Sequence, residues 1–139
     1  MSKFLFLYWN VVFLILVSVN VSASVGTYYA YETVVIACTT SLANLTIQIF
    51  VKKTVGATYN GLFNTFSTGV IASSYVDTGT EIIYTWTIIT GQIVNCVSGS
   101  YAVTAQYNLV GTAQITSADT YVVTTTTTGG VTTTFTGHF

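Results

Sequence analysis

Residues 45–52 alternate between apolar and polar positions, with leucine, isoleucine or valine at every second one. Successive side chains of a β-strand point to opposite faces, so this period of two predicts a strand with one buried face. The segments 82–89 and 101–109 repeat the pattern, with Tyr84 and Trp86 in the buried phase of the first. Three such segments, in a chain body without helical periodicity, predict an all-β fold.

Weaker strand signals and turn signals extend this prediction over the rest of the chain. Glycine, aspartate and serine cluster between the apolar runs, where they favour turns. The doublet Gly129-Gly130 predicts a two-residue hairpin turn with both glycines at positive φ, whereas residues 56–66 have no clear period and predict a long loop or an irregular crossover. About seven or eight strands favour a single antiparallel β-sandwich of the immunoglobulin-like kind. The weaker strands are expected at 33–40, 69–75, 93–98, 120–128 and 131–135.

The first residues have the organisation of a secretory signal. Lys3 gives a positive start, residues 4–17 are almost entirely apolar, and the tripeptide Val-Ser-Ala ending at Ala23 fits a signal-peptidase site. We therefore predict a signal peptide over residues 1–23, cleaved after Ala23. The alternative is an uncleaved membrane anchor, because residues 4–23 are about as long as the 20 or so residues that a membrane-spanning helix needs.

The remaining residues, 24–139, form the predicted β-sandwich domain. Residues 24–32 are expected to form an extended N-terminal arm, and residues 120–136 a C-terminal β-ribbon rich in threonine. Threonine is polar and β-branched, so it favours strands and covers a solvent face without adding charge. The alternative for this tail is a disordered stalk with O-linked glycans, although such stalks are usually rich in proline and the chain has none.

Charged residues are unusually few, which narrows the classes of function. They make up 5 % of the 139 residues and give a formal net charge of −1, whereas about 25 % is usual in a soluble domain. Apolar side chains make up 51 %, so the chain is too apolar and too uncharged for intrinsic disorder. No arginine is present to neutralise phosphates, so a nucleic-acid partner is not expected.

Cys38 and Cys96 are the two cysteines of the chain. An even pair in an exported protein usually forms a disulfide, which is the prediction here. The alternative is two buried free thiols. No metal site and no cofactor are indicated, because two distant cysteines and a single histidine, His138, lack the paired spacing of zinc ligands.

Titratable side chains are too sparse for a typical active site. Asp77 and Glu81 flank one turn and are the best candidates for a carboxylate pair or a weak Ca²⁺ site. The alternative is that both are solvated turn residues ahead of a strand. The sequence therefore predicts a protein that is not an enzyme.

Two surface features could carry modification or recognition instead. Asn44 begins the N-glycosylation sequon Asn-Leu-Thr just ahead of a strand, and we expect it at the surface. Asn20 also begins a sequon, Asn-Val-Ser, but lies in the predicted signal. A row of exposed tyrosines on one face of the sandwich would suit stacking on sugar rings, although Tyr84 and Trp86 are predicted to be core residues.

Strand edges are the remaining candidate for function. Monomeric β-proteins usually protect edge strands with charged side chains, proline or bulges, and such gatekeepers are scarce here. The edges are then expected to be occupied, either within a closed barrel or by a strand of a neighbouring molecule. The candidate donor strands are residues 24–37, whose Val25, Tyr29 and Tyr31 would fill pockets, and residues 120–135.

In its overall organisation the chain resembles the secreted subunits of archaeal surface filaments, pili and threads that assemble by donor-strand complementation. The resemblance covers the whole chain: a signal ending at Ala23, a leader beginning Ser-Val-Gly-Thr-Tyr-Tyr-Ala-Tyr, and one charge-poor sandwich with the sequon at Asn44. It implies a secreted or cell-surface structural protein that forms a head-to-tail polymer by β-strand exchange, carries glycans and has no catalytic activity. We expect no membrane contact after signal cleavage.

A second hypothesis is a secreted or cell-surface immunoglobulin-like module that binds a glycan or a protein. Cys38 within a predicted strand, Trp86 and Tyr101 resemble loosely the hallmarks of that fold. However, Trp86 lies too far along the chain, and Cys96 precedes Tyr101 instead of following it by two residues.

Overall fold

The computed structural model describes residues 15–96 and 99–139, so residues 1–14 of the predicted signal lie outside it. The described residues form nine strands, all paired antiparallel, and one short 3₁₀ turn at Thr116–Ala118. The strands are β1 (Val17–Val25), β2 (Tyr29–Cys38), β3 (Leu42–Lys52), β4 (Thr58–Asn64), β5 (Ile71–Asp77), β6 (Glu81–Ile88), β7 (Ser100–Asn108), β8 (Thr120–Thr127) and β9 (Thr132–His138).

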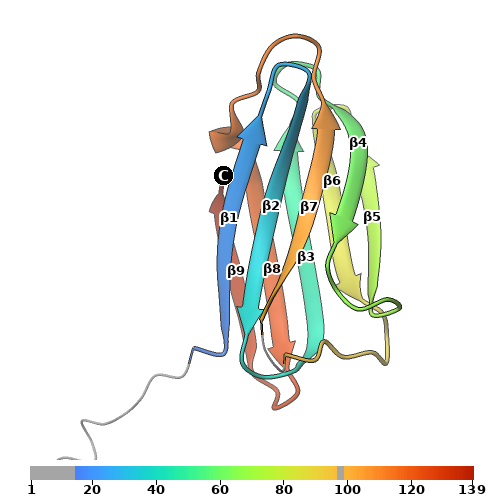
Figure 1. Cartoon of the computed structure of the whole chain (residues 1–139), viewed down its shortest axis with the longest axis vertical. Coiled ribbons are helices and arrows are strands. Elements are labelled where there is room, and N and C mark those ends of the chain that lie inside the picture. Colours follow the sequence, from blue (N-terminus) through green and yellow to red (C-terminus); the bar gives the residue numbers. More distant parts are fainter. Residues whose placement is uncertain (1–14, 97–98) are drawn as a thin grey trace, which may run out of the picture.

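The strands form two sheets that pack face to face (Figure 1). Sheet A has the order β1-β2-β7-β4, and sheet B has the order β5-β6-β3-β8-β9. In Figure 1, β1 lies over β9 at one side of the sandwich and β4 lies beside β5 at the other. The predicted all-β class and the single antiparallel sandwich are confirmed. Within the described ranges, no helix has the length and apolarity needed to cross a membrane.

The core lies between the sheets and is built from the inward phase of each strand. Along β3, the alternate side chains from Leu45 to Val51 are fully buried, and those between them are half-buried. In β6 the same phase buries Tyr84 and Trp86, which are, with Tyr107, the largest fully buried side chains of the described residues. Burial of such aromatic and branched side chains supplies most of the favourable free energy of folding.

Two strands of the structure were not predicted, and one predicted strand is not formed. β4 lies in the segment without a clear period, because a bulge between Tyr59 and Gly61 shifts the alternation by one residue. β1 lies in the segment assigned to the signal. The described part of the segment 93–98 makes only an isolated bridge, between Leu42 and Val94.

β1 runs through the predicted cleavage site. Its odd-numbered residues, from Val17 to Val25, face the same side as the buried residues of β2, while its serines and Asn20 face outward. The strand thus has the alternation of the rest of the sandwich, but in the sequence its valines merge with the apolar run before them. Cleavage after Ala23 would remove seven of its nine residues, 17–23.

The β8–β9 hairpin differs in one detail from the predicted two-residue turn. Only Gly130 has a positive φ, at 89°. The N–H of Gly130 donates to the carbonyl of Thr127, and the N–H of Thr127 donates to the carbonyl of Val131, both at 2.9 Å. The loop therefore has three residues, 128–130, with the left-handed residue last, which is another common hairpin connection.

Candidate assembly interface

Four strands lie at the edges of the two sheets. β4 and β5 flank one side of the sandwich, here called the closed side, and β1 and β9 flank the other, here called the open side (Figure 1). The outer N–H and C=O groups of an edge strand have no partner strand, so a second chain can add a strand there. The two sides differ in how their edges are protected.

On the closed side, an aromatic stack joins the two sheets. The rings of Tyr59 in β4 and Tyr75 in β5 are nearly parallel, with 3° between their planes and 3.5 Å between their centroids. The bulge at Gly61 interrupts the β4 ladder, and a Cβ at this glycine would lie only 2.7 Å from the Gln106 Oε1. Because a bulge bends an edge strand, it hinders the addition of a further strand.

Two ion pairs lie at one end of sheet B, and the one between Lys53 and Asp77 reaches the closed-side strand β5, whereas the other joins the inner strands β3 and β6. The Lys53 Nζ donates to Asp77 at 2.8 Å, and the Lys52 Nζ donates to the Glu81 Oε2 at 2.8 Å. The hydrogen bond from Lys53, followed by one from the Gly79 N–H, holds the pKa of Asp77 below its usual value. The two predicted carboxylate candidates are thus each paired with a lysine. The described residues contain no group of three histidine, cysteine, aspartate or glutamate side chains that could hold a metal ion.

The open side has none of these protections. Neither β1 nor β9 contains lysine, arginine, aspartate, glutamate or proline, and each pairs with its neighbour without a bulge. The outward side chains of β1 are serines and an asparagine, and β9 is mostly threonine. With nine residues in β1 and seven in β9, the open side is a neutral edge long enough to pair with a strand of another molecule.

A buried polar cluster lies between the sheets. Glu32 in β2, the neighbour of β1, and Asp119, just before β8, are both fully buried. The Tyr107 hydroxyl donates to the Glu32 Oε1 at 3.2 Å. Asp119 accepts the backbone N–H of Lys52 at 2.6 Å and the side-chain amide of Gln114 at 2.9 Å. Asp119 therefore ties the end of β3 to the segment that leads into β8.

The environment of the Glu32 carboxyl group in this cluster favours its neutral form. The pKa of Glu32 is raised to about 10, first by burial and then by the neighbouring Asp119, against the opposing hydrogen bond from Tyr107. Glu32 is therefore protonated at pH 7. Its Oε2 has no hydrogen-bond partner among the described residues, and an unpartnered buried oxygen costs less on a neutral carboxyl group than on a charged one. The cluster makes the stability of the fold depend on pH.

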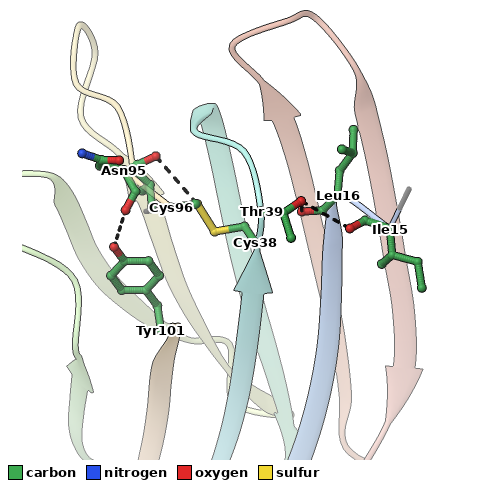
Figure 2. Close-up of a disulfide and its surroundings, with 8 residues drawn as sticks. Ile15, Leu16, Cys38, Thr39, Asn95, Cys96 and Tyr101 are labelled. Atoms are coloured by element: carbon green, nitrogen blue, oxygen red, sulfur yellow. Dashed lines mark hydrogen bonds between the residues drawn. A yellow bond between two sulfur atoms is a disulfide. The ribbon is translucent and has the colours of Figure 1, made fainter. Parts of the chain in front are cut away.

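Cys38 at the end of β2 and Cys96 in the loop after β6 form the predicted disulfide (Figure 2). Beside it, the Thr39 N–H donates to the carbonyl of Leu16 at 3.0 Å, which continues the β1–β2 ladder past the end of both strands. The disulfide therefore links the end of β2, the strand with which β1 pairs, to the loop after β6.

The candidate donor residues lie in paired strands. Val25 ends β1 and is half-buried, while Tyr29 and Tyr31 lie on the outer face of β2 with 40 % and 39 % of their surface exposed. Residues 24–32, where an extended arm is predicted, are divided between β1, a loop and β2, and β2 is paired on both sides. Of the second candidate, residues 120–135, only the part in β9 lies at an edge.

The outer face of sheet B is covered by threonine. Thr46 lies in register with Thr87 and Thr124, and Thr124 with Thr134. Hydroxyls bond each other across the strands, at 3.3 Å between Thr46 and Thr87 and at 3.4 Å between Thr124 and Thr134. Asn44, the predicted glycosylation residue, is exposed in β3 on this sheet. Its modification stays a prediction.

Three residues have positions that the sequence patterns did not predict. Glu32 occupies the inward phase of β2, between Ala30 and Val34, and that phase is the signal that could have identified it as buried. Asn20 is exposed on β1, so the second sequon lies on the surface of the domain. For Asp119 the sequence offers no comparable signal, because it belongs to no strand.

No protein-family model and no curated protein matches the chain. Among solved structures, the chain is similar to the cohesin module of a family 33 glycoside hydrolase from Clostridium perfringens. The identity is 10 %, the match covers 86 % of this chain and 95 % of that module, and the TM-score is 0.48. A likeness this distant carries nothing about partners or activity.

Proposed function

We propose that this protein is a non-enzymatic structural subunit that assembles with copies of itself outside the cell, through β-strand pairing or exchange at the open side, into a filament. The observation that carries the proposal is the unprotected, uncharged edge of β1 and β9, opposite a side that is closed. Strand addition uses main-chain donors and acceptors and needs no charged side chains. This mode of association suits a chain with 5 % charged residues.

An extracellular location is supported by the covalent chemistry. Disulfides persist in oxidising compartments and are rare in the cytosol. The disulfide between Cys38 and Cys96 and the apolar N-terminal run together favour export. Glycans on Asn44 would then project from the threonine-covered sheet and leave the open side accessible.

Strand exchange offers one route to such an assembly. If cleavage after Ala23 removed most of β1, the apolar side chains of Val34 and Ile36 would lose their neighbours on that strand. A strand from another copy, with the same alternation of apolar and polar residues, would cover them and restore the sheet. With β1 retained, pairing takes place at the edge of β1 itself, and both routes use the open side.

The test compares lysine substitutions on the two sides. Lysine on an edge strand opposes pairing with another strand. Ser22→Lys with Thr134→Lys places one charge on each open-side strand, and Thr58→Lys with Ser74→Lys does the same on the closed side; all four residues are exposed. Electron microscopy and light scattering should show filaments for the wild type and the closed-side variant and monomers for the open-side variant. A wild type that stays monomeric at high concentration, or equal effects of both variants, would contradict the proposal.

A second candidate function, glycan binding, is favoured by one surface. Tyr29 and Tyr31 lie on the outer face of sheet A, 6.1 Å apart between ring centroids, opposite Asn108 and Gln106 of β7. Exposed tyrosines beside amide side chains can stack on and hydrogen-bond sugar rings. Binding to a glycan array that Tyr31→Ala abolishes, with Tyr28→Ala as control, would support this function; a wild type that binds no glycan would exclude it.

A further inference from the structure

The free edge of β1 presents the backbone groups of its odd-numbered residues. In the β1–β2 ladder, the Gly26 N–H donates to the carbonyl of Tyr29 at 2.9 Å, and the Thr39 N–H donates to that of Leu16 at 3.0 Å. Antiparallel ladders alternate between hydrogen-bonded and non-hydrogen-bonded pairs. The even-numbered residues of β1 therefore bond to β2, and the odd-numbered residues direct their N–H and C=O groups away from it. These residues are Val17, Val19, Val21, Ala23 and Val25.

The sequence of β1 reads nearly the same in both directions. Its nine residues are Val-Ser-Val-Asn-Val-Ser-Ala-Ser-Val, with Val21 at the centre. If two copies run antiparallel with their Val21 residues opposite each other, Val17 of each faces Val25 of the other. Throughout this register, valine or alanine faces valine or alanine, and serine or asparagine faces serine or asparagine. No charged residue is involved, and like residues meet on both faces of the sheet.

We infer that β1 pairs antiparallel with β1 of a second copy of this chain, about a two-fold axis at Val21. Each copy supplies five free N–H and five free C=O groups, so the pair can form ten hydrogen bonds, five donated by each copy. A register centred on Asn20 or Ser22 instead uses the backbone groups of four residues of each copy and forms eight hydrogen bonds. The two four-stranded sheets A become one continuous sheet of eight strands, and the contact is self-complementary, as a two-fold interface requires.

The other edges are less suited to pairing with themselves. β5 centred on Ser74 would place Asp77 opposite Ile71. β4 is interrupted by its bulge at Gly61. β9 is two residues shorter than β1 and contains Gly137, which weakens a strand. β1 is therefore the edge at which a second copy fits best. The inference rests on the proposed function, since it specifies the partner, strand and register of one contact in that assembly. Because a two-fold contact joins only two copies, a filament needs a second contact, and β9 is the other open-side edge. The inference also requires that β1 remain in the mature protein.

The experiment is register-specific disulfide trapping in the full, exported chain. In the inferred register, Ser18 of one copy faces Ser24 of the other in a pair whose Cα atoms are about 4.5 Å apart, within the range that a disulfide spans. Both serines lie on the outer face of β1, away from the core. Ser18→Cys and Ser24→Cys, co-expressed with different tags, should give a disulfide-linked heterodimer, and each variant alone should give none. Ser18→Cys co-expressed with Ser74→Cys, on the closed side, is the matched control.

The possible results separate this inference from the proposed function. A heterodimer only from the Ser18 and Ser24 variants, linked between these two positions by mass spectrometry, supports the inference. Filaments or dimers without this cross-link overturn the inferred pairing and leave the proposed function standing. The same holds if the intact mass shows a mature chain that begins at Ser24. A protein that stays monomeric in light scattering overturns both.

Discussion

The closed and open sides of the sandwich both end in exposed edge strands, but the two sides differ in how those edges are protected against pairing with another strand. The closed side has the Tyr59–Tyr75 stack, a bulge and the ion pair between Lys53 and Asp77. The open side has nine- and seven-residue strands without charge, proline or bulge. The comparison shows that even a chain with few charged residues can protect one pair of edge strands and leave the other pair without charge.

The placement of the acidic and lysine residues supports this view. In the described residues, two lysines and two acidic residues form the ion pairs at one end of sheet B, between β3, β6 and the closed-side strand β5, and the remaining acids, Glu32 and Asp119, are buried in the core. None lies in β1 or β9. Four experiments test the contrast between the two sides.

The largest effect is expected from removing the disulfide with Cys38→Ser and Cys96→Ser. The bridge spans 58 residues of sequence, and the chain-entropy model then gives a loss of about 4 kcal/mol in the free energy of unfolding. Because Cys38 fastens the end of β2, hydrogen exchange should accelerate in β1 and β2 more than in β4 and β5. Uniform acceleration would show that the disulfide supports both sides equally.

A smaller effect is expected from pH, through Glu32 beside the open side. Its pKa is about 10 in the folded state and 4.5 as the ordinary value, so between these values the folded state binds more protons than the unfolded state. Stability is therefore highest in acid and falls as the pH rises, by up to about 3 kcal/mol between pH 6 and 8.

Denaturant titrations at several pH values, with Glu32→Gln as the comparison, test this dependence. The variant keeps the shape of the side chain and has no proton to lose, so its stability should stay nearly constant over the same range. A wild-type stability that does not fall as the pH rises would mean that water reaches Glu32 and that the core beside the open side is accessible to solvent.

On the closed side, Tyr75→Ala should lower the free energy of unfolding by about 1 to 2 kcal/mol, because it removes the stack with Tyr59 and part of the buried ring surface. Chemical denaturation measures the loss. Tyr28→Ala, at a residue with 71 % of its surface exposed, is the control and should change little. Equal effects at the two positions would mean that the stack does not hold the closed side together.

The smallest change in stability is expected from Lys53→Ser with Asp77→Ser, because surface ion pairs contribute little. The change in association should be larger, since β5 then loses its charge protection. Light scattering should show added association at the closed side, and Ser74→Lys in the same background should suppress it. No added association would show that the Tyr59–Tyr75 stack and the bulge protect this side without the charges.

The strands with strict alternation could be predicted from the sequence, because one face of each is buried in a single core. β3 and β6 show this best, with Leu45 to Val51 and Ile82 to Ile88 buried at every second position. β4 could not be predicted, since its bulge breaks the period of two that identifies a strand. The position of the hairpin at Gly130 could also be predicted, but not its turn type, because a Gly-Gly doublet fits turns of two and of three residues.

The candidate interface was harder to predict than the core. β1 follows directly on an apolar run, so its valines contribute to a signal-like pattern as strongly as to a strand. Whether a strand is at an edge depends on the order of strands in the sheets, which alternation does not encode. Scarcity of charge did direct attention to the strand edges, but it could not show that the protected edges are β4 and β5 and the unprotected ones β1 and β9.

The threonine cover of sheet B has a consequence for behaviour in different solutions. Its hydroxyls bond each other and water, and the whole chain carries a net charge of only −1. The Debye length shrinks from about 30 Å at 0.01 M salt to about 3 Å at 1 M, but this surface has almost no field to screen. Two molecules can therefore approach each other as readily at high salt as at low salt, and their rate of encounter depends on concentration and strand geometry alone.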